Sequence, residues 1–380
     1  MDARKILRLA IFSNLVLVLA SIQNARADPV KVESPCDKDG PFAPRVDQDL
    51  LRKDDLVIEP IELPRVRDKR GRTPKQARER GVCQDAQTGK PVILPDPPRR
   101  SGRQVYPGGD EGDPSLPRGD DRDLQRSNKR GDADPPFFLR TTVFPPEDRV
   151  WQTPTTSFPF RAVVGLQIKF PLTPSNKAKG CTGSLISGKH VLTAGHCVFE
   201  SSEGGWATSI RAMPGLDGML EPFEKDFIEP FGHAFMIQKR SVTCWTQSLD
   251  WECDYGMITL DKTFNVGTFG LLSLSDDTLD NSWAQIIGYP DIGKPPGTQQ
   301  FFVPGGGYIW DYGSKHVEFK IDATQGNSGG GIYRFWNGKR AIFAIVSGEY
   351  PTYNVGTRIT NLRHDKIRGW QCQDGVQSAC

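Results

Sequence analysis

The stretch Cys181–Cys197 reads CTGSLISGKHVLTAGHC, with two apolar runs on either side of a short polar turn. This pattern predicts two adjacent antiparallel strands. Such strands would bring the sulfurs of Cys181 and Cys197 together, and the disulfide would fix the loop that carries His196. The stretch therefore predicts β-structure with a histidine held at the end of a strand.

Further short β-runs follow throughout residues 141–380. They include FRAVVGLQIKF, AQIIGYP, HVEFKI and RAIFAIVSGEY, each bounded by Gly, Pro, Asn or Asp. Long stretches with helical periodicity are absent. We therefore expect residues 141–380 to form an all-β domain, either a barrel or a sandwich.

The first 27 residues resemble a signal peptide. A basic start, Arg4–Arg8, precedes the mostly apolar stretch Leu9–Ile22 and the cleavage pattern Ala25–Ala27. A transmembrane anchor is the alternative, but the stretch is shorter than the roughly 20 apolar residues that a bilayer requires. We expect cleavage near Asp28, a secreted or periplasmic protein and no stable membrane insertion.

Residues 28–140 are rich in Pro, Arg, Asp and Gly, with few aliphatic pairs. Such a stretch buries too little apolar area to offset its chain entropy. We interpret it as a prosegment or linker, disordered at least over Pro95–Pro136, with a small structure over 36–83 if a disulfide closes there. Two Arg-Gly-Asp tripeptides, Arg118–Asp120 and Arg130–Asp132, would fit adhesion, although this composition also produces them by chance.

Composition and motifs argue against several functions. The net charge is +2, and no basic stripe interleaved with aromatic residues appears, so we expect no nucleic-acid partner. The chain has no CxxC pair and no HExxH motif, so we expect no metal and no cofactor. The oligomeric state leaves no signal in the sequence.

Eight cysteines suit an oxidising compartment. Pairing along the sequence gives four candidate disulfides: Cys36–Cys83, Cys181–Cys197, Cys244–Cys253 and Cys372–Cys380. Only Cys181–Cys197 has a structural reason behind it, namely the predicted pair of strands.

Three motifs carry candidate catalytic residues: His196 in VLTAGHC, Asp254 at the head of CDYGMITL, and Ser328 in QGNSGGG. A serine hydroxyl needs a base to become a nucleophile, and a carboxylate can orient an imidazole for that task. Asp250 and Glu252 are alternative carboxylates. Each motif alone could be a surface histidine, a loop carboxylate or a glycine-rich turn, but the three occur together, 58 and 74 residues apart, in the order His, Asp, Ser, which is the chain order of chymotrypsin.

The glycines around Ser328 permit a tight turn. Attack on a carbonyl carbon places negative charge on its oxygen, which backbone N–H groups can stabilise. The N–H groups of Gly326 and Ser328 are the natural pair for such an oxyanion hole.

Residues about 147–365 resemble the chymotrypsin-fold serine proteases, and most closely the secreted bacterial branch that includes the glutamyl endopeptidases. The matching motifs are EDR…FPFRAVVGL, CTGSLI…VLTAGHCV, CDYGMITL, VGTFG, IIGYP…GTQ, IDATQGNSGGG and YNVGTRIT. The resemblance implies two six-stranded antiparallel β-barrels, an active site between them, and a zymogen with an N-terminal prosegment. It also implies a triad of His196, Asp254 and Ser328 that hydrolyses proteins or peptides through an acyl-enzyme, with Gly326 and Ser328 as the oxyanion hole.

Asn327 departs from the digestive members of this family, which carry an aspartate there. That aspartate pairs with the new N-terminal ammonium after activation, whereas a neutral asparagine forms no such ion pair. We therefore expect the loop of Ser328 to be held without a buried ion pair, and processing to unmask the cleft rather than to build it.

The substrate pocket departs from the glutamyl endopeptidases. Val346 and Ala323 stand where those enzymes place a histidine and a hydroxyl residue that contact a glutamate. With Ser347, these residues are expected to line the pocket, and the contacts for glutamate are missing.

Asp322 lies six residues before Ser328, the spacing of the aspartate that pairs with substrate Arg or Lys in trypsin-like enzymes. Glutamyl endopeptidases also carry an aspartate at this spacing without a preference for basic residues. The missing glutamate contacts favour a preference for Arg or Lys before the scissile bond. Arg140 and the dibasic Lys129-Arg130 would then be sites for self-processing.

A non-catalytic binding or adhesion protein on a protease scaffold is the alternative. Such scaffolds usually lose a triad residue, and none is lost here.

Overall fold

The computed structural model describes residues 57–60, 79–84, 89–96, 143–218, 228–280, 282–293, 296–350 and 352–380. The expected signal peptide, both Arg-Gly-Asp tripeptides, Cys36, Lys129-Arg130 and Arg140 lie outside these residues. So does the expected disordered stretch, apart from Pro95 and Asp96. Within the described part, none of the helices combines the length and the apolar character needed to cross a bilayer.

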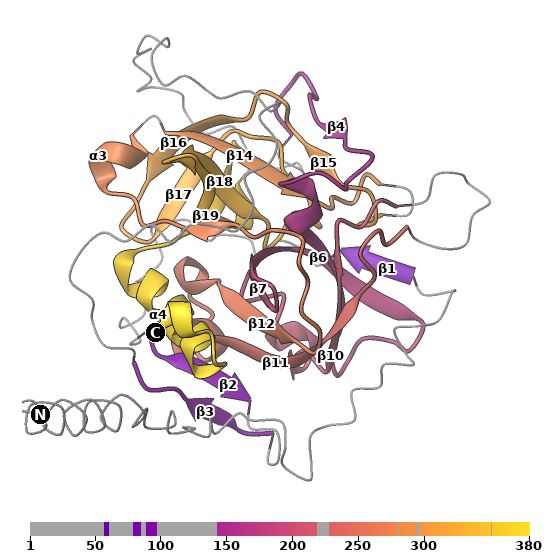
Figure 1. The fold of residues 1–380 in the computed structure, drawn as a ribbon, viewed down its shortest axis with the longest axis vertical. Coiled ribbons are helices and arrows are strands. Elements are labelled where there is room, and N and C mark those ends of the chain that lie inside the picture. The colour runs from indigo at the N-terminus through magenta and orange to yellow at the C-terminus, as the bar shows by residue number, and fades with distance from the viewer. Residues whose placement is uncertain are drawn as a thin grey trace, which may run out of the picture. The chain divides into compact units, whose positions relative to one another are not determined.

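The first barrel is a closed antiparallel sheet of six strands, drawn with β6, β7 and β10–β12 labelled in Figure 1. Its strand order is β10-β5-β6-β7-β12-β11, and a further pairing of β10 with β11 closes the ring. The strands are β5 (Val163–Lys169), β6 (Lys177–Ser187), β7 (His190–Thr193), β10 (Ser209–Pro214), β11 (Ala234–Val242) and β12 (Gly256–Leu260). The predicted hairpin is β6 and β7, with Ser187 opposite His190.

The second barrel closes in the same way, because β18 pairs with both β14 and β19. Its strands are β14 (Trp283–Gly288), β16 (Gly307–Tyr312), β17 (His316–Phe319), β18 (Gly331–Trp336), β19 (Lys339–Tyr350) and β20 (Tyr353–Arg358). Buried aliphatic and aromatic side chains form two main clusters, one centred on the second barrel and a larger one that fills the first barrel and also includes Ile287 and Tyr333 of the second. The expectation of an all-β protein with two six-stranded antiparallel barrels is confirmed.

The remaining short strands extend the two sheets, except β8 and β9, which pair with each other in a separate two-stranded sheet. They are β1 (Val57–Pro60), β2 (Gly81–Gln84), β3 (Pro91–Ile93), β4 (Val150–Trp151), β8 (Phe199–Glu200), β9 (Gly205–Trp206), β13 (Gly270–Leu271) and β15 (Phe301–Phe302). Three of them, β1 to β3, come from the segment that composition assigned to the prosegment. β1 runs parallel to β6, and β2 joins β11. Part of that segment is therefore integrated into the first barrel.

One helix of 13 residues, α4 (Asn361–Gln373), follows the last strand, beginning after Thr360, whose hydroxyl accepts from the Arg363 N–H. The other described helices are one turn long: α2 (Thr243–Thr246), α3 (Asp276–Leu279), η2 (Phe160–Ala162), η3 (Ser201–Glu203), η4 (Trp251–Cys253) and η5 (Gln377–Ala379). Helical periodicity does not predict α4, because its buried side includes charged residues such as Arg363 and Lys366.

Three disulfides lie in the described part: Cys181–Cys197, Cys244–Cys253 and Cys372–Cys380. Cys83 is also disulfide-bonded, to a partner outside the described residues.

Candidate active site

His196 and Asp254 lie next to each other where the paired strands β7 and β12 end and begin. His196 lies in the loop after β7, and Asp254 lies between η4 and β12, which pairs with β7. The Asp254 carboxylate contacts His196 twice: Oδ2 lies 2.7 Å from Nδ1, and Oδ1 accepts the backbone N–H at 2.8 Å. Both residues are fully buried. Because Nδ1 faces a carboxylate, it carries the ring proton, and Nε2 is left to accept one.

Gly195 permits this close approach. A Cβ at Gly195 would lie 2.8 Å from the Trp245 ring and 3.0 Å from the Asp254 carboxylate. Any side chain there would push the histidine loop away from Asp254.

Ser347 supplies a third hydrogen bond to Asp254. Its hydroxyl donates to Oδ2 at 2.6 Å, so a residue expected to line the substrate pocket contacts the carboxylate with its side chain. Three donors compensate for the removal of a carboxylate from water. The alternative carboxylates have other roles: Asp250 caps η4, and Glu252 contacts His316 at 2.8 Å.

Ser328 lies in the loop before β18, with its side chain fully buried. Its Oγ and the Nε2 of His196 are both buried without a hydrogen-bond partner, so the structure does not join them by a hydrogen bond. Such bonds are often long in unliganded enzymes and tighten around substrate. Within the site, the Ser328 hydroxyl is thus a donor without an acceptor, and His196 Nε2 is an acceptor without a donor.

The backbone at Gly326 requires glycine. Its φ is +91°, and a Cβ there would lie 2.2 Å from the Tyr289 carbonyl oxygen. The Gly326 carbonyl accepts from Thr182 Oγ1 at 2.7 Å, and the Ser328 carbonyl accepts from Thr182 N–H at 2.8 Å. In the described part of the chain, the N–H groups of Gly326 and Ser328 donate to no acceptor, so both are available to bind an oxyanion.

Asn327 holds this loop through neutral hydrogen bonds. Its side-chain Oδ1 accepts from Thr324 N–H at 3.1 Å, and its own N–H donates to the Thr324 carbonyl at 3.0 Å. Asn327 is buried. The buried side-chain amide of Asn327 therefore supports the loop of Ser328 without an ion pair.

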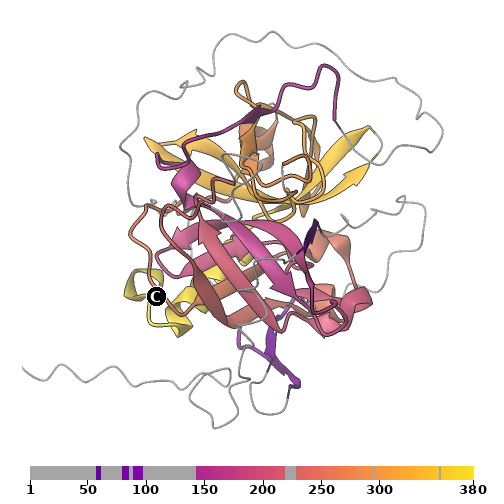
Figure 2. The same ribbon diagram turned by 90° about the vertical axis from the view of Figure 1, so that its right-hand side faces the viewer.

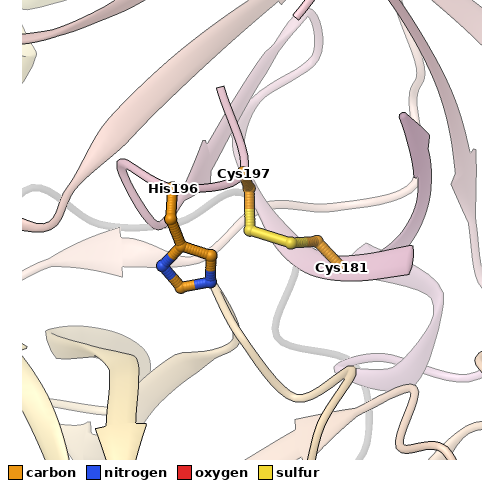
Figure 3. A group of neighbouring side chains, drawn as sticks. All are labelled: Cys181, His196 and Cys197. Carbon is orange, nitrogen blue, oxygen red and sulfur yellow. A yellow bond between two sulfur atoms is a disulfide. The ribbon is translucent and has the colours of Figure 1, made fainter. Parts of the chain in front are cut away.

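The Cys181–Cys197 disulfide connects the loop that carries His196 with strand β6, which contacts the loop of Ser328. Figure 3 shows the His196 imidazole beside the sulfur–sulfur bond, since His196 and Cys197 are neighbours. Thr182, the residue after Cys181, makes the hydrogen bonds to the loop of Ser328. This role of Thr182 could not be predicted, because a threonine in a strand has no distinctive sequence pattern.

Asp322 is almost completely buried, with Ala323 and Val346 also buried. Its Oδ1 accepts from Phe144 N–H at 2.7 Å, and its Oδ2 has no partner. Burial raises the pKa of Asp322, and the Phe144 hydrogen bond opposes this only in part. The sequence did not predict that the segment before the first barrel reaches this carboxylate.

Three comparisons with known proteins all find similarity to proteases. The Trypsin family model matches residues 150–364. The "Extracellular metalloprotease" of Bacillus subtilis is 33% identical over 237 residues, 61% of this chain and 71% of that protein. The "Glutamyl endopeptidase" of Bacillus licheniformis is 28% identical over 257 residues, 65% of this chain and 74% of that protein. A solved Glu endopeptidase in complex with MPD superposes with a TM-score of 0.51 at 21% identity, covering 60% of this chain and 99% of that one, and shows a shared fold.

The name of the Bacillus subtilis relative raises the question of a metal. The described part contains two groups of three residues whose candidate ligand atoms lie within 4.8 Å of one another. One group is Cys181, His196 and Cys197, and the other is Glu79, Cys244 and Cys253. In both groups the cysteines are joined in disulfides. A metal binds the thiolate, which a disulfide does not offer, so neither group fits a metal.

Proposed function

Because this chain belongs to the trypsin family of serine endopeptidases, we propose that Ser328 is its nucleophile, His196 its base and Asp254 the residue that orients the base. The observation that carries the proposal is the double contact of Asp254 with the ring and the backbone N–H of His196. It leaves Nε2 as a buried proton acceptor. The substrates are proteins or peptides.

The steps follow from these roles. His196 Nε2 takes the Ser328 hydroxyl proton while Oγ attacks the carbonyl carbon of the scissile bond. The carbonyl oxygen becomes negative and accepts from the N–H groups of Gly326 and Ser328. The imidazolium then gives its proton to the leaving amine, which departs and leaves an acyl-enzyme on Oγ. Water, deprotonated by the same imidazole, hydrolyses the ester and restores the serine.

Fluorophosphonate labelling tests the nucleophile. We expect one label on Ser328, lost in Ser328→Ala and strongly reduced in His196→Ala. Ser187 offers a matched control, because its hydroxyl lies 2.6 Å from His190 Nδ1 and His190 Nε2 lies 3.0 Å from Asp374. Labelling at Ser187, or unchanged labelling in Ser328→Ala, would reject the assignment.

We further propose a preference for Arg or Lys before the scissile bond. The Oδ2 atom of Asp322 is a buried acceptor without a partner, and Ala323 and Val346 offer no polar contact to an acidic side chain. A guanidinium would find a charge-assisted hydrogen bond there. The Phe144 hydrogen bond to Oδ1 leaves one carboxylate oxygen for the substrate.

Matched substrates ending in Arg, Glu, Phe and Ala test this preference. A desolvated charge pair is worth several kcal/mol, so Asp322→Ser should lower kcat/KM for Arg by about 100-fold and leave Ala substrates nearly unchanged. A preference of the wild type for Glu or Phe, or an Arg preference that survives in Asp322→Ser, contradicts the proposal.

Export and processing complete the proposal. We propose that residues 1–27 are a signal peptide, that 28–140 include a prosegment of a zymogen, and that 141–380 are the protease domain. The relative named as extracellular supports secretion. N-terminal sequencing of the secreted protein tests both cleavages, with Asp28 expected as the first residue of the unprocessed form.

A further inference from the structure

Residues 79–96 precede the protease domain in sequence but belong to its first barrel in space. β2 and β3 form a hairpin, and β2 pairs antiparallel with β11, with Val82 opposite Ser241. In Figures 1 and 2 this hairpin, in indigo and purple, lies against the barrel, and Figure 1 shows it beside α4. It extends the sheet of the first barrel.

The hairpin contributes to the core. Val82 and Cys83 are 0% exposed and Leu94 is 2% exposed, and all three belong to the same apolar cluster as the strands of the first barrel. Gly81 lies so close to α4 that a Cβ there would be 2.8 Å from the Trp370 ring nitrogen. The hairpin thus fills the space between β11 and α4 as core residues do.

The hairpin also neutralises two buried cations of α4. Glu79 accepts from Arg363 Nε at 2.7 Å, and Asp96 accepts from Lys366 Nζ at 2.6 Å. The side chains of Arg363 and Lys366 are each 1% exposed. A buried charge that loses its partner is costly, so α4 needs the hairpin in place.

The same contacts reach the loop of Asp254. Arg363, held by Glu79, donates from Nη2 to the Glu252 carbonyl at 2.6 Å, two residues before Asp254. At the other end of this loop, the Arg80 carbonyl accepts from Thr243 N–H at 2.8 Å, next to Cys244. The segment that the Cys244–Cys253 disulfide closes before Asp254 is therefore contacted directly by the hairpin at Thr243 and, through Arg363, at Glu252.

We propose that residues 79–96 are a permanent part of the enzyme, which stay docked after any cleavage between residues 97 and 142 and hold the loop of Asp254. The active enzyme is then two chains. The six other described cysteines pair among themselves, so no described disulfide ties the hairpin to the protease. The attachment is noncovalent, through strand pairing, apolar burial and two ion pairs.

Cleavage at a defined position tests retention without any catalytic readout. A recognition site for a sequence-specific protease is inserted between Ser115 and Leu116 of the full chain carrying Ser328→Ala. After cleavage, we expect both fragments to co-elute at a one-to-one ratio in native size-exclusion chromatography and to separate on a denaturing gel without reductant. Separation under native conditions overturns the proposal, whatever the fate of the proposed triad.

Glu79→Gln tests the ion pair, with Glu59→Gln as the matched control. Glu59 also lies upstream and contacts Lys177 at 2.5 Å, but its side chain is 36% exposed. We expect Glu79→Gln to weaken fragment association at least tenfold and Glu59→Gln to leave it unchanged; equal effects overturn the role of Glu79. If Glu79→Gln does not fold, the cleavage experiment on the native sequence still decides.

Activity of the cleaved enzyme with Ser328 intact tests the contact with the Asp254 loop. Weaker contact between Asp254 and His196 lowers kcat and shifts the acidic limb of the pH profile downward, with little change in KM. We expect both changes in Glu79→Gln and recovery in Glu79→Asp, which keeps the charge. An unchanged pH profile in a variant that has lost the fragment overturns the link to Asp254.

Discussion

The imidazole of His196 experiences two opposing influences. Burial lowers its pKa, but the charge of Asp254 and its hydrogen bond outweigh burial and raise the pKa above 6.5. The base must be neutral to take a proton, so activity is lost as pH falls through this raised pKa. The environment of one residue thus fixes the acidic limb of the pH profile.

Asp254→Asn should move the acidic limb of the pH profile. Without the carboxylate, burial dominates and the pKa of His196 falls, so the limb moves to lower pH while kcat drops by about 10⁴-fold from the wrong tautomer. Profiles of kcat/KM against pH with an uncharged substrate measure both effects. Asp250→Asn is the control, and a limb that stays in place in Asp254→Asn would mean that another group controls it.

Ser328→Ala should abolish turnover and leave the fold intact. In a comparable triad, loss of the serine alone costs about 10⁶ in kcat. Peptidase assays together with circular dichroism and thermal unfolding measure the two properties. Near-normal activity in this variant would show that the nucleophile lies elsewhere.

Thr182→Val removes a hydroxyl and keeps the side-chain volume. The hydroxyl donates to the Gly326 carbonyl and accepts from Tyr289 N–H at 3.0 Å, so its loss loosens the loop that carries the oxyanion donors. Because a small displacement of reacting groups is expensive, we expect kcat to fall about 10- to 100-fold. Thr182→Ser, which retains the hydroxyl, should stay within a few-fold of wild type, and equal loss in both variants would point to packing instead.

The motifs around His196, Asp254 and Ser328 could be predicted from sequence because their residue types carry the chemistry. Their supports could not. Thr182 and Ser347 are ordinary residue types whose roles arise only when distant strands bring them to the site, as Ser347 reaches Asp254 across 93 positions.

Among the elements, α4 is held by charge rather than by an apolar stripe. Asp374 at its C-terminal end accepts from both terminal nitrogens of Arg240, at 2.7 and 2.6 Å, and contacts His190 Nε2. Burial would raise the pKa of Asp374, but these hydrogen bonds and the Arg240 charge hold it far below the usual range. Hydrophobic periodicity cannot predict such a helix, because the pattern that marks a buried helix face is absent.

Asp374→Asn should destabilise the protein strongly. It leaves the fully buried Arg240 without its counter-charge, which costs about 3–5 kcal/mol. The depressed pKa means that this stabilisation is present above the unfolded-state pKa of Asp and is lost as pH falls toward the folded-state value. Urea unfolding at several pH values measures it, and Asp365→Asn on the same helix, with a side chain 18% exposed, is the control. Similar stability of the two variants would argue against the buried pair.

The Cys181–Cys197 disulfide should matter for stability and activity together. Closing a loop of about 15 residues is worth roughly 3 kcal/mol in the chain-entropy model, and this loop ends beside His196. The double variant Cys181→Ala, Cys197→Ala should lose both, whereas Cys372→Ala, Cys380→Ala should keep activity. A non-reduced digest that links Cys181 to another cysteine would contradict the pairing.

For the whole molecule, the β class followed from the pattern of apolar runs and the two barrels from the family resemblance, whereas the upstream strands were not predicted. Barrel strands repeat at short intervals and leave a regular pattern of apolar runs. β2 instead pairs with β11 from across the chain, and Glu79 meets Arg363 over 284 positions. Composition averaged over residues 28–140 conceals strands of three or four residues among the Pro and Arg around them.

The pairing of β2 with β11 has a consequence for truncated forms of the protein. A protein begun at residue 141 would carry an unprotected strand edge at Arg240–Val242, with bare N–H and C=O groups beside the apolar surface left by Val82 and Leu94. Such an edge recruits strands from other copies. The trimmed domain should therefore form aggregates, whereas a chain that keeps residues 79–96 supplies its own cover and stays dispersed.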